Sequence, residues 1–349
     1  MDIIENLLGY GWWVGVVLIV AGFVALVKGA DWLVDGASAI AKRFGISDLV
    51  IGLTVVAFGT SMPEFVVNMV SVAEGSTDLA ITNILGSNII NTFVILGLTA
   101  LVYPITSQKR SRDFDIPLSI IAGVLVFAFV AVRSPWGDVM PAGDCGDDRG
   151  IGRIGGIVLL AMFVYFLYNT FRHAKDHPEE GPSEMAETPP QPSPQGREMS
   201  ILRALCLILG GLVGLVVGGE LIVKSAVDIA TRMGVSEAII GLTIVALGTS
   251  LPELATSVIA ATKKNADIAL GNVVGSNIFN VFFILGTSAV VHPLPAYEGI
   301  ELDAWAAAAG SLLVWLFVKS NHARQIKRWE GGVLLLVYAG YLTYRLMSL

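Results

Sequence analysis

Two glutamates lie in the middle of long apolar segments of this chain, and each ends the same short motif. Glu64 closes the segment GTSMPE, and Glu253 closes the segment GTSLPE. A carboxylate at the depth of a membrane centre costs about 2.5–3.5 kcal/mol, so each glutamate needs a function or a partner there. A single such residue is often only a hydrogen-bonded structural group, whereas two at equivalent positions favour a shared cation-binding site.

The residues before each glutamate offer neutral oxygen atoms. Pro63 lacks a backbone N–H and disfavours helical geometry at the residue before it, while Gly59 adds flexibility. We therefore expect the carbonyl groups from Ala57 to Thr60 to lose their helical partners. Thr60 and Ser61 add hydroxyl groups. The second motif supplies the same set, namely Ala246, Gly248, Thr249, Ser250 and Pro252.

A second pair of motifs, GSNIIN at 86–91 and GSNIFN at 275–280, offers further oxygens. Ser87 and Asn91 lie four residues apart and so share one helix face, and Ser276 and Asn280 repeat that face. Asn88 and Asn277 fall one residue later, on a different face. We interpret these two as residues for packing or for helix-to-helix hydrogen bonding rather than as cation ligands.

The combined ligand set contains oxygen atoms only, and this favours hard cations. Calcium takes six to eight oxygen ligands in flexible geometry. Iron, copper and zinc are disfavoured, because every histidine lies in a loop or at the end of an apolar segment and the cysteines lack metal-binding spacing. These residues are His173, His177, His292, His322, Cys145 and Cys206.

The chain is an internal duplication. Residues 51–65 match residues 240–254 at 11 of 15 positions with an offset of 189. The same offset aligns the two GSN motifs, and it aligns Gly45 with Gly234, Asp78 with Asp267 and Pro104 with Pro293.

The elements that position these motifs are membrane spans. The chain has 349 residues, of which 54% are hydrophobic and 15% are charged. A water-soluble domain has about 25% charged residues, and no basic tract suggests nucleic acid. Crossing a bilayer takes about 20 apolar residues per helix. Ten segments satisfy this length, at 11–34, 47–73, 80–103, 114–132, 151–171, 201–226, 237–262, 268–291, 302–319 and 331–348. We expect the first to be a retained span rather than a signal peptide, because acidic residues precede it.

The arrangement of the spans follows from charge. Residues 174–200 are rich in Pro, Glu and Ser and predict a disordered linker between a first repeat, 1–173, and a second repeat, 201–349. With both termini outside, 15 of the 22 Lys and Arg residues lie on the linker side and 5 on the other, so the linker is cytoplasmic. Five spans precede it, an odd number. We therefore predict an all-α integral membrane protein of ten helices, built from two inverted five-helix repeats.

The paired GTSxPE and GSNIxN motifs resemble the alpha-repeats of the calcium/cation antiporter superfamily, and specifically its sodium/calcium exchanger branch, over 51–104 and 240–293. The resemblance implies alternating-access exchange of three Na⁺ for one Ca²⁺, which is electrogenic and extrudes Ca²⁺. It implies a Ca²⁺ site made by Glu64 and Glu253 with the carbonyls of Thr60 and Thr249. It also implies flanking Na⁺ sites that draw on Ala57, Ser61, Ser87, Asn91, Ala246, Ser250, Ser276 and Asn280.

Further expectations concern the setting of the protein. We expect no cofactor and no enzymatic activity, with Na⁺, Ca²⁺ and the lipid bilayer as the only partners. We expect a monomer in the cell membrane, or in the inner membrane of a prokaryote. The linker of about 27 residues departs from animal exchangers, whose large cytosolic loop carries calcium-sensing domains.

Four alternatives stay open. A proton/calcium exchanger typically carries a GNxxE-type segment where this chain has GTSxPE. A potassium-dependent exchanger typically carries Asp at the position of Asn280. A channel is disfavoured because paired broken helices in inverted repeats suit a carrier. An intramembrane hydrolase is disfavoured because neither Ser61 nor Ser250 has a nearby histidine base.

Overall fold

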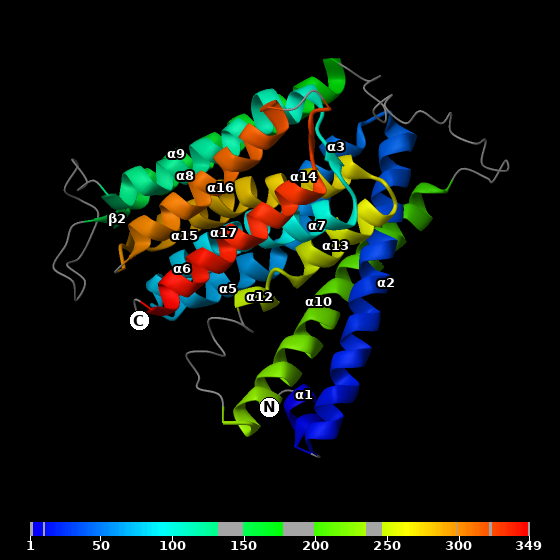
Figure 1. Ribbon diagram of the computed structural model, residues 1–349, viewed down its shortest axis with the longest axis vertical. Coiled ribbons are helices and arrows are strands. Elements are labelled where there is room, and N and C mark those ends of the chain that lie inside the picture. Colours follow the sequence, from blue (N-terminus) through cyan, green and yellow to red (C-terminus); the bar gives the residue numbers. More distant parts are fainter. Residues whose placement is uncertain are drawn as a thin grey trace.

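The computed structural model describes residues 3–9, 11–131, 149–176, 199–234, 246–297, 299–320 and 323–347, and these residues are almost entirely helical (Figure 1). The first half holds α1 (Ile3–Leu8), α2 (Trp12–Phe44), α3 (Asp48–Ile51), η1 (Gly52–Val56), α4 (Ala57–Thr60), α5 (Met62–Ala73), α6 (Thr77–Ile89), η2 (Ile90–Ile95), α7 (Leu96–Val102), β1 (Ile105–Thr106), η3 (Ser111–Asp115), α8 (Ile116–Ala131), β2 (Gly150–Ile151) and α9 (Arg153–Asp176). The second half holds α10 (Ile201–Arg232), α12 (Ala246–Gly248), α13 (Leu251–Thr262), α14 (Ala266–Phe279), η5 (Asn280–Leu285), α15 (Gly286–Val291), β3 (Leu294–Pro295), α16 (Ile300–Ser320), β4 (Gln325–Ile326) and α17 (Arg328–Met347).

The helices are those of a multi-pass membrane protein. Within the described ranges, 7 helices are long and apolar enough to cross a membrane, and α3–α4 with α5 form an eighth candidate span that is bent by 45°. Predicted span 237–262 lies partly outside the described residues and continues as the short apolar helix α13. Predicted span 331–348 corresponds to α17, which is not among these candidates. Most of the linker at 174–200 and the acidic loop Asp138–Asp148 also lie outside the described residues.

Helices α2 and α10 form an antiparallel pair that runs out from the rest of the molecule (Figure 1). Small residues recur every seven positions along both helices, and their backbones touch. A Cβ atom on Gly22 would lie 2.8 Å from the carbonyl oxygen of Gly218, and one on Gly29 would lie 2.7 Å from that of Gly211. Gly36 meets Ala204 in the same way, at 2.7 Å. At Gly22, Gly29 and Gly36 only the absence of a side chain permits this approach, as in other membrane helix pairs.

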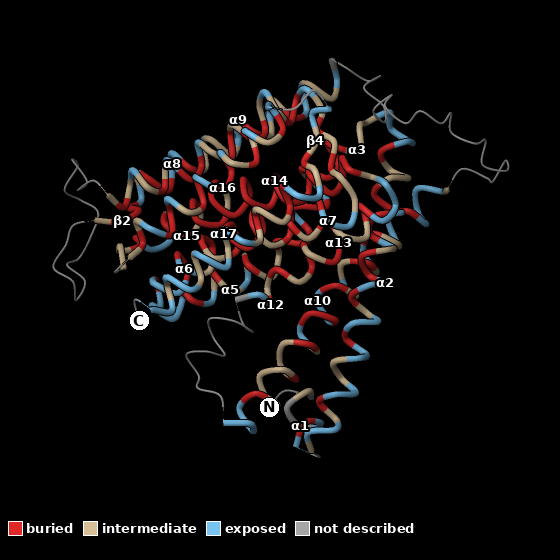
Figure 2. The backbone as a smooth tube through the Cα atoms, in the orientation of Figure 1, coloured by how far each residue is buried: buried red, intermediate tan, exposed pale blue. Residues whose placement is uncertain are grey.

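The remaining helices form a slanted body whose halves interlock. Helix α17 of the second half packs on α7 and η2 of the first, and α9 of the first half packs on α15 and η5 of the second. Helix α14 runs through the centre of this body and is buried along its whole length (Figure 2). The motif GSNIFN at the end of α14 therefore lies in the interior, and residues 87–91 of the motif GSNIIN, on α6 and η2, are buried as well.

Two short strand pairs refine the all-α prediction. Strand β1 pairs antiparallel with β4, and β2 pairs antiparallel with β3; each strand is two residues long. Both pairs join one half of the chain to the other, at the connections between spans. Their backbone N–H and C=O groups hydrogen-bond to each other at positions where the chain is not helical.

Candidate cation site

Each GTSxPE motif interrupts a helix at the same position. Helix α4 ends at Thr60, and α5 begins at Met62 with Pro63 in its first turn. Helix α12 ends at Gly248, and α13 begins at Leu251 with Pro252 in its first turn. Proline is tolerated there because the N–H groups of a first helical turn have no partner within the helix. The two glutamates thus lie in the first turns of α5 and α13.

The two glycines of these motifs pack against side chains of α10. A Cβ atom on Gly59 would lie 2.5 Å from a methyl group of Leu212, and one on Gly248 would meet a methyl group of Val223, so that these side chains would have to shift. Both neighbours belong to α10, so the breaks sit directly against the α2–α10 pair. One sequence expectation is wrong, since the carbonyl of Ala57 keeps its helical partner, the N–H of Ser61, at 3.1 Å.

The two glutamates come together across the repeats. Both side chains are completely buried, and their carboxylates interact electrostatically. The Ser61 hydroxyl donates to Oε1 of Glu253 at 3.0 Å, and the Ser250 hydroxyl donates to Oε1 of Glu64 at 3.5 Å. Each motif therefore supports the carboxylate of the other motif.

Several buried oxygens at this site have no hydrogen-bond partner among the described residues, which is uncommon for buried polar groups. Most belong to predicted ligand residues and occur in repeat-related pairs; Oδ1 of Asn277, which was not predicted to be a ligand, is unpaired as well. The predicted ones are Oε2 of Glu64 and Glu253, Oγ of Ser87 and Ser276, and Oδ1 of Asn91 and Asn280, together with Oγ1 of Thr249. The hydroxyls of Thr249 and Ser276 still interact with the carboxylates of Glu64 and Glu253, without the geometry of a hydrogen bond. Unpaired buried oxygens of this kind fit ligation of a cation.

The GSN motifs place their asparagines by contacts between helices. Asn88 donates to the carbonyl of Asn277 at 3.2 Å, and Asn277 donates to Oγ1 of Thr92 at 2.7 Å. The prediction that Asn88 and Asn277 hydrogen-bond between helices is confirmed. Asn280 donates its amide to Oδ1 of Asn88 at 3.0 Å, which leaves its own oxygen available. Asn91 and Asn280 both lie in π-helical turns, which are frequent at functional sites.

Asn272 is a site residue that the sequence analysis missed. It lies on α14, is fully buried, and accepts a hydrogen bond from Oγ1 of Thr60 at 3.0 Å. Its amide donates to the carbonyl of Glu253 at 3.2 Å and to Oγ of Ser257 at 2.9 Å. One side chain thus holds Thr60 and Glu253, from different repeats, in place. Repeat comparison was the available signal, since Asn272 aligns with Asn83.

The hydrogen bonds described above join part of the predicted set: Ser250 to Glu64, and Ser61 and, through Asn272, Thr60 to Glu253. Glu64, Glu253, Thr60, Ser61, Ser250, Ser87, Ser276, Asn91, Asn280 and Ala57 are buried, and Thr249 is partly buried. The side chain of Ala246 lies outside the described part of the chain. No group of three or more His, Cys, Asp or Glu that could hold a metal ion occurs among the described residues. The site therefore offers two carboxylates and a set of neutral oxygens.

Comparison with known proteins gives consistent results. A family model described as sodium/calcium exchanger protein matches residues 14–172 and 203–347. The sodium/calcium exchanger MaX1 of Methanosarcina acetivorans is 32% identical over 343 residues, which cover 94% of this chain and 97% of that protein. The uncharacterized membrane protein MJ0091 of Methanocaldococcus jannaschii is 35% identical over 324 residues, or 93% of this chain and 95% of that protein.

Solved structures also match. A structure of the sodium-calcium exchanger NCX_Mj soaked with zero Na⁺ and Ca²⁺ superposes with a TM-score of 0.76 at 31% identity, covering 95% of this chain and 98% of that chain. The all-helical membrane fold expected from the sequence is confirmed.

Proposed function

Because the chain belongs to the sodium/calcium exchanger family, we propose that it is a secondary antiporter that exchanges Na⁺ for Ca²⁺ by alternating access. The observation that carries this proposal is the set of buried oxygens without hydrogen-bond partners on Glu64, Glu253 and the paired GSN motifs, most of them in repeat-related pairs. Ca²⁺ binds the two carboxylates together with the carbonyls of Thr60 and Thr249. Na⁺ binds flanking positions that use the serine and asparagine oxygens of both repeats and the carbonyls of Ala57 and Ala246, where the Ala57 carbonyl would ligate in addition to accepting the N–H of Ser61.

The two halves act as inverted repeats in a ten-span protein. The offset of 189 supports this, because it relates the contacts between the halves to one another. Gly22 maps to Gly211 and Gly29 maps to Gly218, so the Gly22–Gly218 contact becomes the Gly29–Gly211 contact when the halves are exchanged. The Ser61–Glu253 and Ser250–Glu64 hydrogen bonds are related in the same way.

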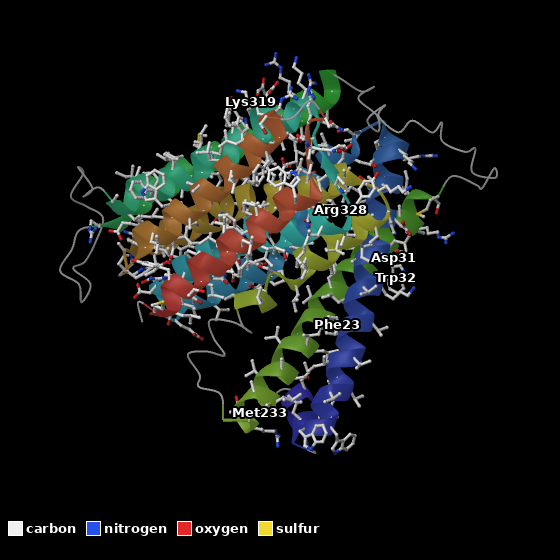
Figure 3. The ribbon with its side chains drawn as sticks, in the orientation of Figure 1. Phe23, Asp31, Trp32, Met233, Lys319 and Arg328 are labelled. Atoms are coloured by element: carbon white, nitrogen blue, oxygen red, sulfur yellow. The ribbon has the colours of Figure 1, made fainter. Side chains whose placement is uncertain are left out.

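The membrane orientation follows from the basic residues. Figure 3 places Lys319 at the upper end of the molecule and Met233 at the lower end of α10, while α1 and the C-terminal end of α17 lie on the lower side in Figure 1. We place the Lys319 side in the cytoplasm, because Lys and Arg concentrate in cytoplasmic loops. The linker 174–200 then lies in the cytoplasm, and both termini lie outside.

Charge couples the two substrates. Two carboxylates are neutralised by one Ca²⁺ or by Na⁺ ions that use the same oxygens, so the substrates compete. An empty site with two charges is costly to move through a low-dielectric region, so loaded forms switch more readily than empty ones.

An exchange of three Na⁺ for one Ca²⁺ moves one positive charge inward. A tenfold sodium gradient supplies about 1.4 kcal/mol per ion, and about 100 mV adds about 2.3 kcal/mol per charge. The total of about 6.5 kcal/mol sustains a calcium gradient of order 10⁴ to 10⁵, so Ca²⁺ extrusion is the natural direction.

The test is calcium uptake into everted membrane vesicles that contain the protein. We expect uptake when the vesicles are loaded with Na⁺ and diluted into sodium-free medium, and background uptake when Na⁺ is equal on both sides. Uptake that a pH gradient drives equally well without sodium contradicts the proposal.

A further inference from the structure

Two turns at opposite ends of the body have the same geometry. In the turn after α5, the N–H groups of residues 74, 75 and 76 donate to the carbonyls of Val70, Val72 and Ser71, at 2.9, 3.2 and 2.8 Å. In the turn after α13, the N–H groups of residues 263, 264 and 265 donate to the equivalent carbonyls at 3.0, 2.9 and 2.9 Å. The middle residues are both left-handed, with φ of 80° at Gly75 and 61° at Lys264. Residues 74 and 263 are therefore structural equivalents.

The second turn is fastened to α2 by charge. The ammonium of Lys263 lies 2.6 Å from a carboxylate oxygen of Asp31 and 2.6 Å from one of Asp35. Burial lowers the pKa of Lys263, but the hydrogen bonds and charges of the two aspartates raise it, and the net result is above the ordinary value. Figure 3 places Asp31 on α2 beside the body of the molecule.

Apolar packing reinforces this contact. Ala255 on α13 is 8% exposed and Ala260 is fully buried, and both pack in one cluster with residues of α2 that include Leu33 and Val34. Helix α2 therefore covers α13 from the broken motif to the Lys263 turn.

The equivalent contact at the first turn is open. Val66 and Val70 on α5, which align with Ala255 and Ile259, are 54% and 49% exposed. A cavity of about 410 Å³ lies between α5 and α10, and its lining includes Val66, Glu220 and Lys224. Glu220 and Lys224 pair with each other at 2.8 Å. Glu74, the equivalent of Lys263, is exposed.

The offset of 189 relates the two groups of charges. Asp31 and Asp35 correspond to Glu220 and Lys224 on α10, and Lys263 corresponds to Glu74. Each group contains one lysine and two carboxylates. In the first group the lysine, Lys263, lies in the turn, whereas in the second group the lysine, Lys224, lies on helix α10. A close approach of α10 to α5, equal to that of α2 to α13, therefore again brings one ammonium between two carboxylates.

We propose that Glu74, Glu220 and Lys224 form a second ion cluster, which closes the cavity between α5 and α10 in the opposite transport state, when the Lys263 cluster has opened. The inference rests on the proposed alternating-access function. The α2–α10 pair moves as one unit because its helices are in backbone contact, so closing one side opens the other. Partly exposed ion pairs bias such an equilibrium modestly, roughly two- to fivefold.

A charge exchange tests the electrostatic part. Glu74→Lys leaves two lysines with one carboxylate, and Lys224→Glu leaves three carboxylates with no lysine. We expect each single variant to reduce sodium-driven calcium flux roughly two- to fivefold. The double variant Glu74→Lys/Lys224→Glu recreates the layout of the Lys263 cluster and should restore flux. The double variant Asp78→Lys/Lys224→Glu is the matched control. It introduces the lysine at position 78 instead of position 74, four residues further along the chain, and should not restore flux.

Cross-linking tests the geometric part. In a protein with serine at Cys145 and Cys206, a pair of cysteines at positions 74 and 224 should cross-link, as should a pair at positions 35 and 263. In the variant that carries both pairs, one molecule should form one cross-link or the other but not both.

The outcomes separate this inference from the proposed function. Failure of the 74–224 pair to cross-link in protein that still transports, or both cross-links in one molecule, overturns the second cluster. Loss of rescue by the double variant overturns its electrostatic role. Absence of sodium-driven calcium flux in the unaltered protein overturns the proposed function instead, and the cross-links still report whether the two sides alternate.

Discussion

Replacement of Glu253 by glutamine removes one charge from the site while keeping its shape. The Ser61 hydroxyl donates to Oε1 of Glu253 at 3.0 Å, and the amide oxygen of a glutamine can accept the same hydrogen bond. The side chain is completely buried, so solvent water does not compensate for the lost negative charge. The variant therefore isolates the contribution of charge to cation binding.

The expected effect is large. Two unit charges about 4 Å apart interact by about 4 kcal/mol at the effective dielectric constant of about 20 that suits protein sites. A divalent cation loses at least this attraction, which corresponds to about a thousandfold weaker binding. Calcium flux at ordinary substrate concentrations should fall to background, and Glu64→Gln should have the same effect because Glu64 occupies the equivalent position.

The assay is sodium-driven calcium flux in vesicles, with the amount of inserted protein measured in parallel. Glu330→Gln is the matched control, since Glu330 is also buried, at 2% exposure, but accepts the N–H of Lys327 at the start of α17, away from the site. Near-normal exchange by Glu253→Gln, or a loss of flux in Glu330→Gln equal to that in Glu253→Gln, refutes the claim that the charge of Glu253 contributes to cation binding.

Four further predictions concern topology, coupling, selectivity and positioning. A cysteine at Ser193, in a protein that lacks Cys145 and Cys206, should resist impermeant thiol reagents in intact cells; labelling from outside contradicts a cytoplasmic linker. Sodium and not the proton should drive calcium flux, because the predicted site adds hydroxyl and amide oxygens that can ligate Na⁺ to the two carboxylates; a pH gradient that suffices alone refutes this. Exchange should not require potassium, because Asn280 is neutral and adds no third carboxylate that would help to neutralise an extra monovalent cation; flux that vanishes without potassium at clamped voltage is the contrary result. Asn272→Leu should weaken apparent calcium affinity by about fivefold or more while the protein still inserts, because buried partners lose about 1–3 kcal/mol of hydrogen bonding; unchanged affinity removes its positioning role.

The sequence predicted the site well where chemistry and duplication coincide. Glu64 and Glu253 stand out because a carboxylate in an apolar span is costly, and the offset of 189 predicts their convergence. Asn88 and Asn277 could be assigned to contacts between helices because they fall off the shared face of the GSN motifs. These inferences need only local spacing and symmetry.

Other features depend on tertiary packing. Asn272 lies between Thr60 and Glu253 only because α14 packs against η1 and α4, and no local spacing shows this. The π-helical turns at Asn91 and Asn280 leave no clear mark in composition. The seven-residue recurrence of Gly15, Gly22, Gly29 and Gly36 is visible in the sequence, and it was the available signal for the α2–α10 contact.

The glycine contact between α2 and α10 provides a reference distance within the protein. Probes on α2 and α10 placed across the Gly29–Gly211 crossing should report one fixed separation in every ion condition if the pair moves as one unit, because the two backbones are in direct contact there. A spectroscopic distance from either helix to the body can then be interpreted as displacement of the whole pair. A substitution that adds a side chain at this crossing should broaden or shift the measured distance between α2 and α10 before it alters the cation site itself.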